Sequence, residues 1–283
     1  MNRESAVALR KQLGIIGKVD LSEVVGHLGL SIREVDAEGF DGALVRSAHE
    51  VRGIVFVKQT MRDQSRKRFT IAHEIGHYIL HDDARVSCGS NDIESWNRTL
   101  ENPERQADEF AAELLLPSAE VRQHIGKQWP SFQPVISLCN MFGASLTAAA
   151  RKYCDVVSQR CAVVYSVKRI VRWIHPSPSF NYYVPVGNKI GHDSIAARAF
   201  DGKPVPDVME EVPAEDWISS YWLRQDACIQ EQVIAMPSYE ACLSLLWANR
   251  DLENKPSEED QLLEELDPNR FDSLTRKVWP SKK

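Results

Sequence analysis

The feature that most constrains this chain is His-Glu-Ile-Gly-His at residues 73–77, inside a long segment with helical apolar spacing. On an α-helix, residues four positions apart lie about 40° apart around the axis, so the imidazoles of His73 and His77 point the same way. We predict that this helix is largely buried, because the residues around the motif are apolar: Phe69, Ala72, Ile75, Ile79 and Leu80. Buried polar side chains need partners, and one metal ion can serve both imidazoles.

Two neutral imidazoles whose nitrogens face the same position are typical of a zinc site, in which Zn²⁺ accepts nitrogen ligands at about 2.0–2.1 Å. Glu74 flanks the same face of the helix, where it cannot easily ligate the same ion but can reach a water molecule beside it. This is the position of a general base. We therefore predict His73 and His77 as metal ligands and Glu74 as the catalytic residue. The alternative is an amphipathic helix that carries three solvated polar residues.

A catalytic zinc needs a third protein ligand and one open coordination position. Glu-Arg-Gln-Ala-Asp at residues 104–108 begins the next helical segment, 27 residues past His77, so a second helix can cross the first. We predict Glu104 as the third ligand. Asp108, one turn further on, is predicted to accept the N–H of a liganding histidine and so to fix its orientation. The alternative for Glu104 is a solvated acid in the first turn, where the helix dipole favours it.

The first 117 residues are predicted to form a small sheet with helices around it. Strand patterns occur at 30–35, 42–46 and 53–58, and helical patterns at 7–13, 21–28, 65–81 and 104–116. If the strand at 53–58 forms an edge of the sheet, an extended peptide can add to it alongside Val55 and Val57 by backbone hydrogen bonds. The alternative is a strand that is paired on both sides.

An efficient peptidase also needs a group that stabilises the oxyanion of the transition state. Tyr78, His81 and His49 are the candidates, and the sequence does not choose among them. His81 lies one turn past His77. We interpret it as a residue that supports the ligands from outside or acts structurally, rather than as a ligand itself.

Residues 118–158 are predicted to form a helical module that resembles a helix-turn-helix. Its two main helices, at 134–142 and 146–154, are joined by Gly143-Ala144-Ser145, in which glycine supplies the turn and Ser145 caps the second helix. The second helix offers only Thr147, Arg151 and Lys152 for reading bases or neutralising phosphates. This favours a module that packs against the peptidase and helps to seat the substrate over one that binds DNA directly.

The remainder of the chain is predicted to form an α/β domain at 159–250 and a charged tail at 251–283. Strand patterns occur at 161–167, 171–174, 182–186 and 228–236, and helical patterns at 193–200 and 239–248. Aromatic side chains of this domain are predicted either to line a pocket or to form its core. The fold class that follows is α+β: a small-sheet-plus-helices zinc peptidase domain at 1–117, the helical module, and the C-terminal α/β domain.

Charge, hydropathy and cysteine content indicate which partners and which cellular compartment to expect. The formal net charge of −6 makes the molecule as a whole a poor non-specific binder of nucleic acid or anionic membrane. No apolar run is long enough to span a bilayer, and residues 1–11 lack the apolar stretch of a signal peptide. The six cysteines are scattered and include no C-x-x-C pair, which argues against a thiolate zinc finger and against a disulfide framework. We therefore expect a cytoplasmic protein that does not contact the membrane.

Two longer strings give this pattern a specific resemblance. Arg-Phe-Thr-Ile-Ala-His-Glu-Ile-Gly-His-Tyr-Ile-Leu-His at 68–81 and Glu-Arg-Gln-Ala-Asp-Glu-Phe-Ala-Ala-Glu-Leu-Leu-Leu-Pro at 104–117 resemble the ImmA/IrrE family of bacterial metallopeptidases, with a gluzincin-type ligand set. The order of peptidase, helical module and GAF-like C-terminal domain also resembles that of IrrE-like proteins. One departure is Asp108, where asparagine is expected at least as often, although either side chain can orient a histidine.

The resemblance implies a zinc-dependent endopeptidase with one Zn²⁺ per chain. Its implied substrate is a helix-turn-helix repressor of the xenobiotic-response-element type, encoded nearby, whose cleavage relieves repression of stress or mobile-element genes. The alternative from a different class is a regulator that binds a repressor or DNA without cutting anything. In that alternative the metal site is structural or vestigial.

Overall fold

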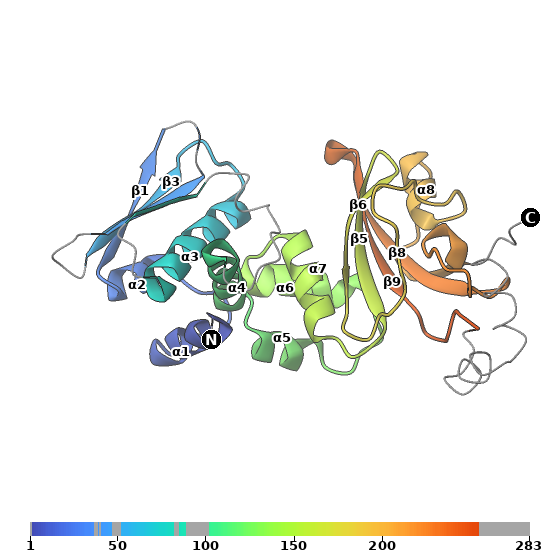
Figure 1. Ribbon diagram of the computed structural model, residues 1–283, viewed down its shortest axis with the longest axis horizontal. Helices are drawn as coiled ribbons and strands as arrows, with labels where there is room; N and C mark the ends of the chain where they lie inside the picture. The colour runs from blue at the N-terminus through green and yellow to red at the C-terminus, as the bar shows by residue number, and fades with distance from the viewer. Residues whose placement is uncertain are drawn as a thin grey trace, which may run out of the picture.

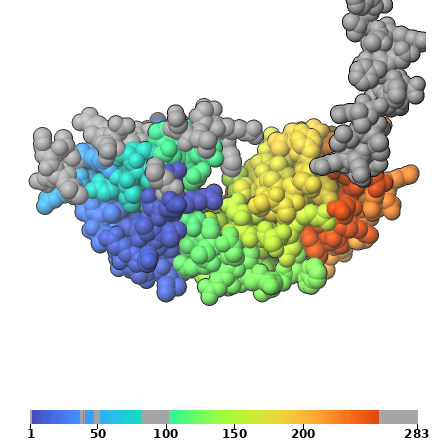
Figure 2. All heavy atoms as spheres, turned by 60° about the horizontal axis from the view of Figure 1, so that its bottom comes forward, coloured from blue at the N-terminus to red at the C-terminus, as the bar shows by residue number. Residues whose placement is uncertain are grey.

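A computed structural model describes residues 2–36, 39, 41–46, 52–81 and 102–254, together with the backbone of 85–88. A small sheet with helices, a group of helices and a larger sheet follow one another along the longest axis of the molecule (Figure 1). The space-filling view shows the middle helices, in green, against both the N-terminal part and the C-terminal sheet (Figure 2). Among the described helices, none combines the length and the apolar character that crossing a bilayer requires. The mixed α+β class is confirmed.

The N-terminal part is a four-stranded sheet with helices on one face. The strands, in the order β1-β3-β2-β4, are β1 Leu30–Val35, β3 Gly53–Lys58, β2 Gly42–Arg46 and β4 Arg85–Cys88. The helices are α1 Asn2–Gln12, α2 Leu21–His27, α3 Gln64–Leu80 and α4 Pro103–Leu115. Alternate strand residues point toward the helices and are fully buried against them, including Leu44, Val55 and Val57. The first three strands have the bounds expected from the sequence.

The expectation of an edge strand at 53–58 is wrong. β3 pairs in parallel with β1 on one side and antiparallel with β2 on the other, so the backbone groups beside Val55 and Val57 are already used within the sheet. Both valines have no exposed surface. The physical reason lies in the composition of the segment, because a short run of β-branched and aromatic residues is typical of a strand buried between neighbours. The edges of the sheet are β1 and β4.

Two N-cap residues fix where α3 and α4 begin, and one glycine allows the two helices to approach each other closely. Asp63 caps α3 by accepting the backbone N–H of Ser65 at 2.8 Å, and Asn102 caps α4 by accepting that of Glu104 at 3.0 Å. Where the helices are closest, a Cβ atom on Gly76 would lie 3.0 Å from Cα of Ala107. Only glycine leaves room for this backbone approach, which carries the first turn of α4 across the middle of α3.

The middle helices are α5 Ser118–Ile125, α6 Phe132–Phe142 and α7 Leu146–Val156. Gly143 ends α6 in the left-handed conformation, with φ of 65°, and Ser145 caps α7 by accepting the N–H of Ala148 at 3.2 Å. The predicted turn chemistry between α6 and α7 is therefore present. Side chains of α7 that were weighed for DNA contact point inward instead: Lys152 is buried and ion-paired with Glu113, and the guanidinium of Arg151 lies over the ring of Trp173.

The C-terminal part is a five-stranded antiparallel sheet in the order β6-β5-β9-β8-β7. Its strands are β5 Cys161–Val167, β6 Ile170–Pro176, β7 Glu210–Pro213, β8 Cys228–Met236 and β9 Ala241–Trp247. Within residues 159–254, α8 Ile195–Phe200 is the one helix of more than a single turn. The predicted helix at 239–248 is wrong, because those residues form the central strand β9. The predicted strand at 182–186 is also wrong, because that segment is irregular. The GAF-like assignment stays a prediction.

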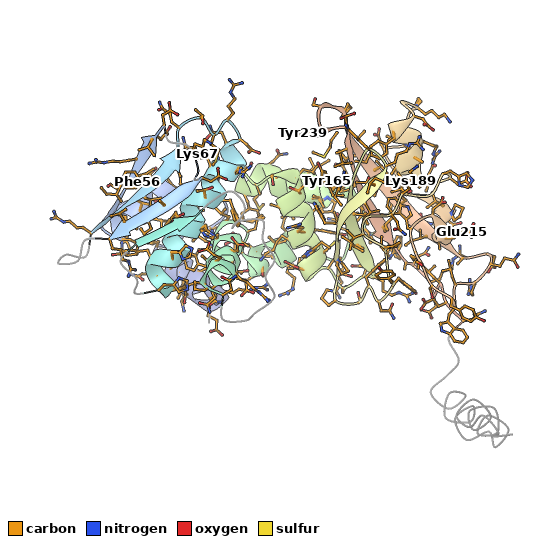
Figure 3. The ribbon with its side chains drawn as sticks, turned by 45° about the horizontal axis from the view of Figure 1, so that its top comes forward. Phe56, Lys67, Tyr165, Lys189, Glu215 and Tyr239 are labelled. Atoms are coloured by element: carbon orange, nitrogen blue, oxygen red, sulfur yellow. The ribbon has the colours of Figure 1, made fainter. Side chains whose placement is uncertain are left out.

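Two cores lie on the two faces of this sheet. On one face, Leu138 and Tyr153 of the helical module pack with Val163 and Leu245 of the sheet. On the other face, α8 and the loops cover the alternate strand residues. Tyr165 lies on the side that faces the helices and stacks on Trp173 (Figure 3). A strand buried on both faces carries no polar alternation, which is why the apolar run of β9 has the spacing of a helix as much as that of a strand.

Candidate metal centre

The three side chains predicted as ligands, His73, His77 and Glu104, meet above the sheet. Nε2 of His73 lies 3.2 Å from Oε2 of Glu104, and Nε2 of His77 lies 3.3 Å from Oε1 of the same carboxylate. The two Nε2 atoms are 3.0 Å apart. Both imidazoles come from the middle of α3 and are buried, whereas the carboxylate comes from the first turn of α4 and is about a quarter exposed, at 26%. The cluster is therefore accessible to solvent on the side of this carboxylate.

The spacing of these donors fits a tetrahedral ion. With zinc–ligand distances of about 2.05 Å, two donors of a tetrahedral site lie about 3.3 Å from each other. The three donor–donor distances here, 3.0, 3.2 and 3.3 Å, are close to that value. His73, His77 and Glu104 thus form the group among the described residues that could hold a metal ion. Three protein ligands leave a fourth position open, as catalytic zinc sites require.

The electrostatics of the cluster favour one shared positive charge. Burial would lower the pKa of His73, but its hydrogen bonds to Asp108 and Glu104 outweigh burial and raise that pKa to about 9. Burial lowers the pKa of His77, the nearby carboxylate of Glu104 acts in the opposite direction, and the charge of His73 adds to the effect of burial. Burial would raise the pKa of Glu104, but the two histidines beside the carboxylate lower it well below its ordinary value. A proton or a metal ion can supply that charge.

Asp108 orients the first histidine. Its Oδ1 accepts a hydrogen bond from Nδ1 of His73 at 2.8 Å, which leaves Nε2 of that ring directed at the centre of the cluster. A carboxylate cannot donate, so this bond selects the tautomer in which Nδ1 carries the hydrogen. Asp108 lies one turn past Glu104 on α4, and the predicted pairing of an acid with a histidine is present.

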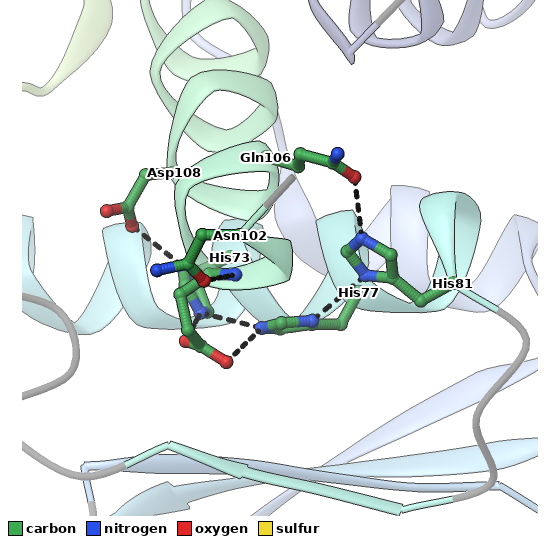
Figure 4. A network of polar contacts seen from close by, with 7 residues as sticks. His73, His77, His81, Asn102, Gln106 and Asp108 are labelled. Atoms are coloured by element: carbon green, nitrogen blue, oxygen red, sulfur yellow. Dashed lines mark hydrogen bonds and ion pairs between the residues drawn. The ribbon is translucent and has the colours of Figure 1, made fainter. Parts of the chain in front are cut away.

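Glu74 is fully buried between the two histidines along α3 and faces the sheet. A Cβ atom on Gly42 of β2 would lie 2.7 Å from Oε1 of Glu74 and 2.4 Å from Cγ2 of Thr70. The carboxylate therefore rests against the backbone of β2 at a position where the strand has no side chain. β2 pairs with β4, and Gly42 lies opposite Cys88, so the edge strand β4 runs past this side of the cluster (Figure 4).

Two of the three predicted oxyanion groups, Tyr78 and His81, are directed away from the open side of the cluster. The hydroxyl of Tyr78 donates to the backbone oxygen of Leu28 at 3.4 Å, and its ring is covered by Arg46. His81 contacts His77 and Gln106 through its two ring nitrogens, so neither is directed at the open side. The predictions of Tyr78 and His81 as oxyanion groups have no support from this geometry, and His49 lies outside the described residues.

Sequence reasoning missed three positions that shape the centre: Gly42, Gly76 and Gln106. Each acts through a neighbour that is distant in sequence, namely Glu74, Ala107 and His81. The signal for Gly76 was available, since a glycine inside a helical motif marks a close backbone approach. No local pattern distinguishes Gln106 from a solvated helix residue.

Comparisons with known proteins concern the same region. A family model described as the IrrE N-terminal-like domain, Peptidase_M78, matches residues 25–153. A solved structure described as a Mycobacterium tuberculosis transcriptional regulator is similar over 87% of this chain and 76% of that chain, with a TM-score of 0.50 and 14% sequence identity. At this identity the similarity concerns the fold alone. No curated protein matches the chain.

Proposed function

Residues 25–153 carry a domain of the ImmA/IrrE family, and on this premise we propose that the chain is a zinc-dependent endopeptidase. The observation that carries the proposal is the convergence of His73, His77 and Glu104 on one point at tetrahedral donor spacing. A buried Glu74 beside two such imidazoles supplies the base that peptide hydrolysis needs. A helix with solvated polar residues would show neither the burial nor the convergence.

Each residue of the centre has its own role in the proposed reaction. His73, His77 and Glu104 would hold one zinc ion, which when bound supplies a Lewis acid for the scissile carbonyl. Glu74 accepts a proton from the attacking water and delivers it to the amine nitrogen of the leaving fragment. Asp108 keeps the first histidine in its ligating tautomer. Burial of Glu74 against Gly42 keeps its carboxylate in one place during both proton transfers.

The substrate we propose is a helix-turn-helix transcriptional repressor. This part of the proposal rests on the family resemblance. We propose that an extended peptide binds along β4, an edge strand of the described sheet that pairs with β2 beside the cluster; β3, which is paired on both sides, is not available. Direct DNA binding by α7 is disfavoured, since Lys152 and Arg151 make contacts inside the protein. We propose further that the protein acts in the cytoplasm and that its C-terminal domain is a GAF-like sensor.

The test compares the wild type with Glu74→Gln and His73→Ala, using the purified helix-turn-helix repressor encoded by a neighbouring gene and metal analysis of each protein. We expect Glu74→Gln to retain one zinc per chain and lose cleavage by at least about a hundredfold, because general-base catalysis contributes that much. His73→Ala is expected to lose the zinc as well.

Three results would contradict the proposal. A wild type that binds no zinc would remove the centre itself. A wild type that binds both zinc and the repressor without cutting it would establish the non-cleaving regulator instead. Cleavage that persists unchanged in Glu74→Gln would show that a different residue or a contaminating protease performs the reaction.

A further inference from the structure

A second chain of hydrogen bonds leaves the cluster on the opposite side from Asp108. Nδ1 of His77 lies 3.1 Å from Nδ1 of His81, and Nε2 of His81 lies 2.9 Å from Oε1 of Gln106. His81 is the C-cap residue that follows the last residue of α3, and its backbone N–H donates to the carbonyl of His77. Gln106 belongs to α4, between Glu104 and Asp108. Figure 4 shows Gln106 and Asp108 reaching α3 on opposite sides of α4.

The direction of these bonds follows from the atoms involved. The oxygen of the Gln106 amide only accepts, so Nε2 of His81 must donate to it. A neutral imidazole has one donor and one acceptor nitrogen, so Nδ1 of His81 must then accept from Nδ1 of His77. Nε2 of His77 is then an acceptor: in the absence of a metal ion it can accept from Nε2 of His73, 3.0 Å away, and it can instead ligate a metal ion. If the amide of Gln106 were rotated by 180°, its NH₂ group would donate to Nε2 of His81. The direction of both hydrogen bonds would then be reversed, and Nε2 of His77 would carry the hydrogen.

We propose that His81 and Gln106 are positioning residues that hold His77 in the tautomer able to ligate a metal through Nε2. The inference rests on the proposed function in so far as the metal is the zinc of that centre. The role parallels that of Asp108 toward His73, so each ligating histidine has its own acceptor, and both acceptors are fixed by α4.

The two histidines are oriented by different chemistry. Glu74, Glu104 and Asp108 already place three carboxylates around the two imidazoles. A fourth carboxylate behind His77 would add repulsion among acids in a partly buried site. A neutral histidine backed by a neutral amide supplies the acceptor without a further charge. Partners of this kind typically contribute a factor of about 10 to 100 in metal affinity.

The test uses four variants of the full chain. His81→Leu removes the acceptor of His77, and Gln106→Met removes the acceptor that fixes the tautomer of His81; both change the size of the side chain little. His81→Gln is the conservative rescue, because its amide oxygen can accept from His77 while its NH₂ group donates to Gln106. Gln123→Met, at an exposed position of α5, is the matched control.

Two measurements are made on each protein. Zinc affinity is determined by competition with a chelator, and the tautomer of His77 is determined from its ¹⁵N chemical shifts in the metal-free, ¹⁵N-histidine-labelled protein. We expect His81→Leu and Gln106→Met to lower zinc affinity about 10- to 100-fold, and His77 to lose its single Nδ1–H tautomer. His81→Gln and Gln123→Met should stay within about threefold of the wild type, since both keep an acceptor behind His77.

The outcomes separate this inference from the proposed function. If the wild type binds zinc while His81→Leu and Gln106→Met change neither the affinity nor the tautomer, the positioning role is wrong and the peptidase proposal stands. A lowered melting temperature with both readouts unchanged would also overturn it, because the two residues would then only tie the end of α3 to α4. If the wild type itself binds no zinc, the proposed function fails first.

Discussion

Glu231 of β8 is a fully buried carboxyl far from the metal centre. Its two oxygens accept the backbone N–H groups of Ile195 and Ala196, at 2.8 and 3.1 Å, where α8 begins, and the hydroxyl of Ser244 at 3.2 Å. Burial raises the pKa of Glu231 to about 7 even though these bonds favour the charged form. The residue is therefore neutral in mildly acidic solution and charged in mildly basic solution.

This pKa makes the stability of the protein depend on pH. The ordinary carboxyl pKa of 4.5 applies in the unfolded chain, so the folded state binds the proton more tightly. The stabilisation is fully present below that value and is lost as pH rises through about 7. From pH 5.5 to 8, we expect the free energy of unfolding to fall by about 2 kcal/mol through this residue.

Urea unfolding at the two pH values, followed by tryptophan fluorescence, checks this expectation. Glu231→Gln should flatten the pH dependence, whereas Glu215→Gln, an exposed residue of the same domain, should leave it as in the wild type. An unchanged slope in Glu231→Gln would assign the pH dependence to another group.

Side chains that share a helix face were predictable from the sequence. The direction of His73 and His77 follows from a spacing of four residues, and the same spacing links Glu104 to Asp108. Gln106 was not predictable, because its role depends on where α3 ends and on the packing of α4 across it. Gly42 was missed for the same reason, since its contact with Glu74 joins a strand to a helix.

Among the elements, the contact between α3 and α4 decides whether the centre forms. A Cβ atom on Gly76 would lie 3.0 and 3.1 Å from Cα and O of Ala107 and 3.2 Å from the ring of Phe110. The backbone atoms cannot move without moving α4. We expect Gly76→Ala to lower the free energy of unfolding by about 1–3 kcal/mol, the usual cost of overpacking, and to weaken zinc binding by separating Glu104 from the histidines.

Chemical unfolding and zinc titration of the same samples test this prediction. Gly26→Ala is the matched control, because Gly26 lies in α2 with nothing within 4 Å of an added Cβ. It should be neutral or stabilising by up to about 1 kcal/mol, since alanine favours helix more than glycine does. If Gly76→Ala binds zinc as the wild type does, the close approach does not set the geometry of the centre.

Elements were predicted well where their faces differ in polarity. β1, β2 and β3 have the expected bounds because turn residues interrupt the chain between them. β9 was mistaken for a helix because both of its faces are buried, so its apolar run has no period. The pairing of β3 on both sides depends on β1 lying beside it in parallel, which no local signal specifies.

At the scale of the whole molecule, a buried ion pair joins α4 to the middle helices. Nζ of Lys152 on α7 lies 2.7 Å from Oε2 of Glu113 on α4, and both side chains are 5% exposed. Glu113 also accepts the backbone N–H and the hydroxyl of Ser118, at 2.7 Å each. Burial would raise the pKa of Glu113, but the ammonium of Lys152 and these bonds lower it. Glu104 and Glu113 thus anchor the two ends of α4 to different parts of the protein.

Lys152→Met should leave the Glu113 carboxylate buried without its cation. We expect the free energy of unfolding to fall by about 3–5 kcal/mol, and the double variant with Glu113→Gln to regain much of this loss. Lys127→Met, at an exposed site, is the control. Urea unfolding of the four proteins is the measurement, and equal stability of Lys152→Met and the wild type would contradict the prediction.

The order of the three parts was predictable, whereas their junctions were not. The proposed boundary at 158 lies inside a core that α6, α7 and one face of the larger sheet build together. Turn residues in the sequence mark where elements end, but a core shared between neighbouring parts leaves no mark in the chain itself. The boundaries at 117, 158 and 250 stay predictions.

All three residues of α4 that act on the histidines lie in its first turn and a half: Glu104 by contact with both rings, and Gln106 and Asp108 through their far nitrogens. Their effect depends on spacing within α3 and within α4, and on the meeting of Gly76 with Ala107, but not on the number of residues that connect the helices. Homologues carrying this centre should therefore tolerate insertions and deletions between His81 and Asn102, whereas a single residue inserted between 104 and 108 would rotate the acceptors away from their rings. A sequence signature for such centres consists of two ungapped segments separated by a stretch of variable length.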